Sequence, residues 1–142
     1  MKFTFIESKD KEEIIAYSKE KSNLISKIES LCLEDNNKII AYSNHIIKEL
    51  NPIEIECFYT ENEKVYALYQ GKTYQIKKRL YELNKQLNNT FIYINQSCLA
   101  NIDQIDHFDA SIGGALMVVF KSGYKDYVSR RQIKNVKERL GI

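Results

Sequence analysis

Hydrophobic and polar residues alternate with a period of two along most of the chain, as is typical of strands that bury one face. Turn-forming residues separate these runs, and Gln70-Gly-Lys72 contains a glycine that can adopt a positive φ in a tight turn. The pattern therefore predicts a mainly β fold with some helix (α+β), built from hairpins and a β-meander. The expected strands are residues 38–42, 46–50, 53–59, 65–69, 73–77, 115–120 and 124–128.

Three further segments show the three- and four-residue spacing of amphipathic helices. The longest is expected over residues 10–33, after a strand at residues 2–6, and the others over residues 80–87 and 130–140. The apolar stripe of the long helix should be buried, either against the hairpin of residues 38–50 or against the same helix in a second copy. That stripe consists of Ile14, Leu24, Ile28 and Leu31.

The run after Pro52, the only proline, also alternates with a period of two. We expect it to be a strand with one buried face, because successive side chains of a strand point to opposite sides of the sheet. One side would carry Ile53, Ile55, Cys57 and Tyr59, and the other Glu54, Glu56 and Phe58.

The chain has 142 residues and 44% hydrophobic content, which suit one domain with a real core. No internal repeat or flexible linker is evident, so we distinguish only an N-terminal strand, helix and hairpin start, residues 1–45, from a second part, residues 46–142. No run approaches the roughly 20 apolar residues of a membrane span, and no signal peptide is evident. We therefore expect a cytoplasmic protein without membrane insertion.

Three cysteines, Cys32, Cys57 and Cys98, lie far apart in the sequence and form no CxxC pair. This spacing favours reduced thiols over a disulfide framework or a zinc site. We expect each cysteine to be a small buried hydrophobic residue.

The net charge of +2 conceals a concentration of basic residues near the C-terminus. Residues 121–142 contain far more basic than acidic side chains, and Lys77-Lys-Arg79 forms a second cluster. Such clusters are the electrostatic footprint of a polyanion partner, although a solvated helix face would look the same. The basic residues of the C-terminal segment are Lys121, Lys125, Arg130, Arg131, Lys134, Lys137 and Arg139.

Polar side chains gather where the apolar run from Phe91 ends and a loop should begin, at Asn95-Gln-Ser97. A second polar group, Ser129-Arg-Arg131, directly precedes the expected C-terminal helix. Asn and Gln match the N6/N7 edge of adenine, and Arg matches phosphate oxygens and the O6/N7 edge of guanine. These residues point to a DNA-binding domain built mainly from sheet, the alternative being an ordinary half-exposed sheet edge.

With these residues in view, residues 46–142 resemble the LytTR DNA-binding domain of bacterial transcription regulators. The likeness rests on the order and spacing of several short pieces. They are Pro52-Ile-Glu-Ile-Glu56, Glu63-Lys-Val-Tyr66, Tyr81-Glu-Leu83, Phe91 with Ser97 and Asn101 in an F-x-x-x-x-x-S-x-x-x-N arrangement, Ile105, and Val128-Ser-Arg-Arg131.

The resemblance implies an elongated set of small sheets whose loops, and not a recognition helix, enter successive major grooves of double-stranded DNA. It also implies sites made of paired repeats, which two copies of the chain could occupy, so we expect a homodimer at least on DNA. The N-terminal arrangement looks like the stand-alone branch of the family, without a receiver domain. The expected DNA-contacting residues are Glu63, Lys64, Asn95, Gln96, Ser97, Ser129, Arg130 and Arg131.

Other functional classes find little support in the sequence. His45 and His107 lack the partners of a catalytic or zinc motif, and Gly113-Gly114 is not followed by the helix of a phosphate-binding loop. The RNP motifs and GxxG clamp of RNA-binding modules are missing too. We therefore expect a sequence-specific transcriptional regulator with no catalytic residue, cofactor or metal ion. The main alternative is a LytTR-like interaction module that binds another regulator or a membrane partner without reading DNA.

Overall fold

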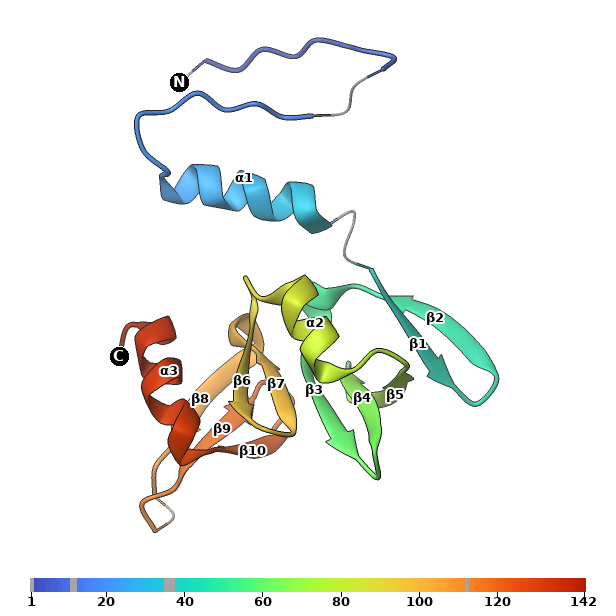
Figure 1. Cartoon of the computed structure of the whole chain (residues 1–142), viewed down its shortest axis with the longest axis vertical. Helices are drawn as coiled ribbons and strands as arrows, with labels where there is room; N and C mark the ends of the chain where they lie inside the picture. The colour runs from blue at the N-terminus through green and yellow to red at the C-terminus, as the bar shows by residue number, and fades with distance from the viewer. Residues whose placement is uncertain (1, 11–12, 35–37, 112) are drawn as a thin grey trace. The chain divides into compact units, whose positions relative to one another are not determined.

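The chain folds into antiparallel strands and a few short helices, which confirms the expected mainly β (α+β) class (Figure 1). Two compact units are present, Met1–Asn36 and Asn37–Ile142. The hairpin that the sequence divided between two parts lies within the second unit. The structure is a computed structural model that describes residues 2–10, 13–34, 38–111 and 113–142.

The described part of the first unit contains one helix, α1 (Asn23–Glu34). Residues 2–6 form no strand, so the strand expected there is wrong. Residues 13–22 are not helical, so the helix expected over residues 10–33 is wrong for that part, and its residues 11 and 12 lie outside the described residues. The stripe that was expected to be buried is largely exposed. The exposed fractions are 68% for Ile14, 48% for Leu24 and 61% for Leu31, whereas Ile28 is half-buried.

Serine side chains explain why α1 starts late. The Ser18 hydroxyl donates to the Glu20 carbonyl and accepts from the Glu20 N–H, which satisfies the backbone locally and competes with helix formation. Ser22 lies directly before α1, and its hydroxyl accepts from the Ile25 N–H at 3.4 Å, as an N-cap residue does. Helical spacing alone therefore overestimated the length of this helix.

The second unit consists of a seven-stranded sheet in the order β2-β1-β5-β4-β3-β7-β6 and a three-stranded sheet in the order β10-β9-β8. The larger sheet contains β1 (Ile39–Ser43), β2 (Ile46–Leu50), β3 (Ile55–Glu61), β4 (Lys64–Tyr69), β5 (Lys72–Ile76), β6 (Phe91–Asn95) and β7 (Cys98–Asn101). The smaller sheet contains β8 (Ile105–Asp109), β9 (Leu116–Phe120) and β10 (Lys125–Val128). The helices are α2 (Leu80–Leu87) and α3 (Arg130–Leu140), and both confirm the sequence prediction.

The central strands β3, β7 and β6 are buried on both faces, because α2 packs on one face and the smaller sheet with α3 packs on the other. Phe58 belongs to the core beneath α2, and Cys57 belongs to the core beneath the smaller sheet. The single buried face expected for this strand is therefore wrong, since Phe58 is 0% and Glu56 6% exposed. Ile53 precedes the strand in a 3-10 turn and is 45% exposed.

Three hairpins of the larger sheet close through two-residue turns in which both residues have positive φ, the geometry whose twist matches that of the strands. These turns pair Ser43 with Ile46, Glu61 with Lys64, and Tyr69 with Lys72 in the strand registers. The turn residues are Asn44 and His45, Asn62 and Glu63, and Gln70 and Gly71. The hairpin and meander turns expected from the sequence are thus confirmed.

A local repeat, which the sequence reading missed, precedes β3 of the larger sheet and β8 of the smaller sheet. Asn51 and Asn101 each cap a 3-10 turn, Pro52–Glu54 and Ile102–Gln104, and each turn leads into a strand whose register shifts after its first residue. The two asparagines are followed at equal spacing by Ile55 and Phe58, and by Ile105 and Phe108. The same device therefore starts β3 in one sheet and β8 in the other.

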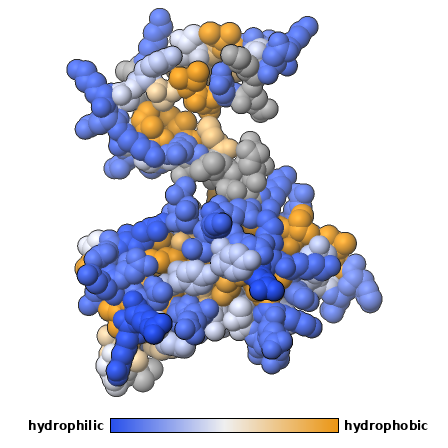
Figure 2. All heavy atoms as spheres, in the orientation of Figure 1, coloured by the Kyte–Doolittle hydropathy of each residue, from blue (hydrophilic) through white to orange (hydrophobic). Residues whose placement is uncertain are grey.

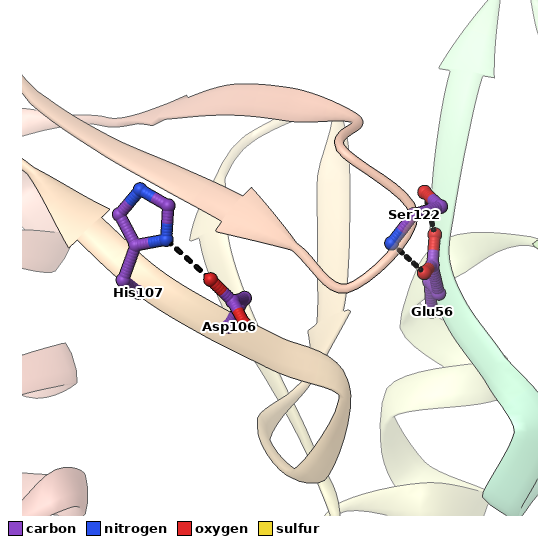
Figure 3. A network of polar contacts seen from close by, with 4 residues as sticks. All are labelled: Glu56, Asp106, His107 and Ser122. Carbon is purple, nitrogen blue, oxygen red and sulfur yellow. Dashed lines mark hydrogen bonds and ion pairs between the residues drawn. The ribbon is translucent and has the colours of Figure 1, made fainter.

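The repeat carries an acidic residue at one position, and the two copies use it differently (Figure 3). The buried Glu56 carboxylate accepts from the Ser122 N–H at 2.8 Å and from the Ser122 hydroxyl at 2.6 Å. Asp106 is exposed and contacts the neighbouring His107 ring at 2.6 Å. Through these two hydrogen bonds, Glu56 of β3 holds the β9–β10 turn, and so links the smaller sheet to the larger one.

The outer strand β2 is the most exposed strand of the larger sheet. Figure 2 shows hydrophobic side chains at the surface over the β1–β2 hairpin, where Ile46 is 59% and Ile47 70% exposed. Cys57 and Cys98 are buried as expected, but Cys32 is exposed, so the expectation for that thiol is wrong. None of the helices in the described ranges is long and apolar enough to cross a membrane.

Candidate nucleic-acid interface

Three segments that are far apart in the sequence meet at one end of the second unit, the lower end in Figure 1. The Thr60 N–H donates to the Ser97 carbonyl at 2.9 Å, which joins the end of β3 to the β6–β7 turn. The Ser129 N–H donates to the Ile94 carbonyl at 2.8 Å, which joins the start of α3 to β6. We call this surface the loop edge. It comprises Asn62, Glu63 and Lys64, Gln96 and Ser97, and Ser129, Arg130 and Arg131.

The structure brings together almost all the residues that the sequence selected. Ser129 is half-buried and Asn95 is buried, whereas the other six are exposed. Within the described residues, Lys64, Arg130 and Arg131 make no ion pair or side-chain hydrogen bond, so their charges are available to a partner. The exposed residues are Glu63, Lys64, Gln96, Ser97, Arg130 and Arg131.

Asn95 differs from its neighbours because its side chain points into the protein. It is 1% exposed, its amide donates to Asp126 and to the Tyr127 carbonyl, and its oxygen accepts from the Ser97 N–H. In this structure Asn95 shapes the loop edge and does not present its amide to a ligand. The sequence could not show this, because the same side chain serves base reading and backbone bonding equally well.

The start of α3 adds to the positive character of the loop edge. Ser129 is the N-cap residue, but its hydroxyl makes no capping bond, so it remains available. The first N–H groups of a helix carry partial positive charge and favour anions such as phosphate. Arg139, by contrast, donates to the Asn88 carbonyl near the end of α2 and serves the packing of α3.

Acidic residues, which the sequence reading missed, border the same surface. An open groove of about 360 Å³ is lined by two rings, two hydroxyls and two carboxylates. Desolvation by burial raises the pKa of the Tyr124 hydroxyl in this groove, so that group stays protonated. The two carboxylates, from Glu61 and Asp126, give this groove a negative character beside the basic side chains of the loop edge. The lining residues are Tyr59, Thr60, Glu61, Ser97, Tyr124 and Asp126.

The comparison with protein families decides what this fold is. The family model described as the LytTr DNA-binding domain matches residues 45–141. The chain belongs to the LytTR DNA-binding domain family. The expected family is confirmed, and so is the association with DNA binding and transcriptional regulation.

Relatives of this LytTR chain occur in Staphylococcus aureus. A protein of strain MSSA476 is 30% identical over 143 residues, spanning 97% of this chain and 96% of the relative. A protein of strain NCTC 8325 is 32% identical over 110 residues, spanning 78% of this chain and 75% of the relative. Both carry the name uncharacterized HTH-type transcriptional regulator.

The LytTR fold is also seen in a solved structure, the LytTr DNA-binding domain of a Bacillus cereus protein named as a methyl-accepting/DNA response regulator. The two chains superpose with a TM-score of 0.70 at 16% identity, over 75% of this chain and 98% of the other. This likeness concerns the fold alone. Strands separate α1, α2 and α3 in the present chain, so the described residues contain no helix-turn-helix, although the names of the staphylococcal relatives mention one.

Proposed function

We propose that this LytTR chain is a sequence-specific regulator of transcription that reads the major grooves of double-stranded DNA with its loop edge. The observation that carries the proposal is the convergence of Gln96, Arg130 and Arg131, exposed and without internal partners, on two adjacent segments. A surface of protruding turns suits a groove better than an enclosed small molecule. A cytoplasmic location, where bacterial DNA lies, follows from this proposal.

Each group of the loop edge has a chemical counterpart on DNA. The Gln96 amide can donate and accept at an adenine edge, and an arginine can donate twice to a guanine edge. Lys64 can reach a phosphate, and so can the hydroxyls of Ser97 and Ser129. Glu63 cannot bind phosphate, and we assign it either to a cytosine amino group or to rejection of a wrongly placed backbone.

The test begins with selection of bound sequences from a random duplex library, followed by titration of the selected site. Arg130→Ala, Arg131→Ala and Gln96→Ala should each weaken binding, by about 1–3 kcal/mol where a bidentate base contact is lost. Lys72→Ala is the matched control for the two arginine variants, because Lys72 begins β5 at the end of the larger sheet opposite the β3–β4 turn and its loss also removes one positive charge. If all variants bind like the wild type, these residues are not the readers.

Binding should also weaken steeply as salt is raised, because each phosphate contact releases condensed counterions. Lys64→Ala should remove about one phosphate contact. The slope of log affinity against log salt should therefore become shallower by about one unit, while the preferred sequence stays unchanged. No binding to any duplex at low salt would favour the interaction-module alternative, for which the exposed isoleucines of β2 offer a surface.

We further propose that two copies occupy paired repeats about one DNA turn apart, as the family resemblance implies. Simultaneous contact would raise the effective concentration of the second copy and make binding cooperative. Titration of duplexes with one and two repeats tests this directly. Two independent sites, each with the affinity of an isolated repeat, would exclude pairing.

A further inference from the structure

We propose that Asn95 is a positioning residue that joins the two reading segments of the loop edge into one preformed surface. This inference rests on the proposed function and names the residue on which its sequence specificity depends. Asn95 would not touch DNA. It would fix where Gln96 and Arg130 lie relative to each other.

The contacts of Asn95 cross from one reading segment to the other. Its amide donates to the Asp126 carboxylate at 3.2 Å and to the Tyr127 carbonyl at 2.9 Å, both on β10. Its oxygen accepts from the Ser97 N–H at 2.8 Å, which closes the β6–β7 turn and leaves Gln96 at the tip. One buried side chain therefore holds the turn and the strand that leads into α3.

The partners of Asn95 are themselves fixed. Asp126 also accepts from the Tyr127 N–H at 2.8 Å, so its carboxylate is held from two sides. The adjacent Ser129 N–H bonds the Ile94 carbonyl, and this contact continues the connection up to Arg130. Every member of this network has a partner, so the loss of Asn95 would remove one hydrogen-bond partner each from Asp126, the Tyr127 carbonyl and the Ser97 N–H.

Preorganisation matters more for reading bases than for holding phosphates. A bidentate contact to a base requires the donor to lie in one plane at one place, whereas a lysine or arginine can follow a displaced phosphate. Loss of Asn95 should therefore reduce binding to the selected site much more than binding to unrelated DNA. It should also make the contributions of Gln96 and Arg130 independent of each other.

The chain offers a matched control in Asn101, which lies at the opposite end of the β6–β7 hairpin. Asn101 is also 1% exposed, its oxygen accepts from the Asp103 N–H, and its amide donates to the Ile55 carbonyl at 2.9 Å. Replacing either asparagine by alanine removes a buried amide with bonds of the same kind. Of the two asparagines, only Asn95 connects the reading segments.

The first experiment compares Asn95→Ala with Asn101→Ala for thermal stability, for binding to the selected duplex and for binding to a scrambled duplex. Asn95→Ala should lose about 10- to 100-fold in affinity for the selected duplex, the range expected when one or two base contacts fail, and should change little on the scrambled duplex. Asn101→Ala should lower stability to a similar degree but retain the ratio of the two affinities. The proposal would be overturned if the ratio of the two affinities fell equally in both variants, or if it fell in neither.

A second experiment does not depend on how well Asn95→Ala folds. Asn95→Asp places a carboxylate against Asp126 and should impair specific binding, whereas the double variant Asn95→Asp with Asp126→Asn exchanges donor and acceptor between the two positions. The exchange restores the hydrogen bond between positions 95 and 126 but not the bond from position 95 to the Tyr127 carbonyl, so it should recover part of the specificity lost in Asn95→Asp. Failure of the double variant to bind better than Asn95→Asp would count against the proposal.

A third experiment measures the coupling itself. In the wild-type and Asn101→Ala backgrounds, the binding free energy lost by the double variant Gln96→Ala with Arg130→Ala should differ from the sum of the two single losses. In the Asn95→Ala background the double loss should equal that sum. If the wild-type chain binds no duplex, the proposed function fails and this inference fails with it. If the wild type reads its site and Asn95→Ala reads it equally well, only the inference fails.

Discussion

Asparagine and serine side chains act mainly on the backbone of this chain. Asn51, Asn95 and Asn101 each accept a hydrogen bond from the N–H two residues further on, and Ser22 accepts one before α1. These short polar side chains start and close elements because they substitute for missing backbone partners. The sequence could place them at turns, but it could not separate Asn95, which is internal, from Gln96, which is exposed.

Glu63 should be strained, because it holds a φ of 64° that residues with a Cβ adopt only at a cost. Glu63→Gly should raise the free energy of unfolding by about 0.5–1 kcal/mol, the net of relieved strain and greater unfolded-state entropy. Gly71→Ala, in the next turn, is the control and should lower the free energy of unfolding, because the φ of Gly71 is 74°. No atom lies within 4 Å of an added Cβ, so the effect would come from the backbone conformation and not from a clash. Denaturant titration measures both, and a less stable Glu63→Gly would contradict the argument.

The three thiols should differ sharply in reactivity. A hydrogen bond with Cys57, followed by desolvation, raises the pKa of Cys98 well above its ordinary value, so its thiolate is scarce near neutral pH. Cys32 is exposed, whereas Cys57 and Cys98 are buried. With a thiol reagent at pH 8, Cys32 should react at once and the other two only after denaturant is added. Rapid reaction of all three in the folded protein would show that the cores open readily.

Among the elements, those whose pattern matched a single buried face were predicted well. Helix α2 presents Leu80, Leu83 and Leu87 to the core as their spacing predicts. The same reasoning was wrong for strand β3, because a strand that is buried on both faces need not alternate hydrophobic and polar residues. Helix α1 was overestimated because spacing says nothing about the burial that most helices need for stability.

Helix α2 should be essential to the core above β3. Leu83 is 0% exposed there, so Leu83→Ala should lower the free energy of unfolding by about 2–5 kcal/mol through the cavity that it leaves. Tyr81 lies on the same helix and is 59% exposed, so Tyr81→Ala should have little effect. Thermal unfolding followed by circular dichroism compares the two, and similar losses would place the core elsewhere.

The junction between the sheets depends on Glu56. Glu56→Ala leaves Ser122 without its acceptor and should cost about 1–3 kcal/mol of stability, whereas Ser122→Ala removes one donor and should cost about 0.5–1.5 kcal/mol. The double variant should cost less than the sum of the two, since the groups share one interaction. Additive losses would mean that Glu56 and Ser122 act independently.

On the scale of the whole molecule, the two units contribute unequally. Both hydrophobic cores are made of residues from 39 onward, and no described side chain of the first unit is buried. The family match likewise covers residues 45–141. This inequality could not be predicted from the sequence, because the apolar spacing in residues 10–33 resembles that of a packed helix.

A fragment of residues 38–142 should therefore fold alone with nearly the stability of the full chain, and it should bind a single repeat of the selected duplex with unchanged affinity. Cooperative binding to paired repeats is the property that it would lose if the first unit joins two copies. Calorimetry of the fragment and of the full chain tests the first point, and a fragment that fails to unfold cooperatively would refute it.

Strand β3 lies at the boundary of both cores and pairs with β4, its neighbour in sequence, and with β7, which follows much later. Pairing of β3 with β7 requires the long chain segment between them to be brought into place first. This step is slow because the segment loses conformational entropy before the contacts between the two strands form. A slip of β3 by one residue would turn Phe58 and Cys57 to the wrong sides and disrupt both cores together. Stopped-flow refolding should therefore show one rate for both cores, with β3–β7 closure as the barrier.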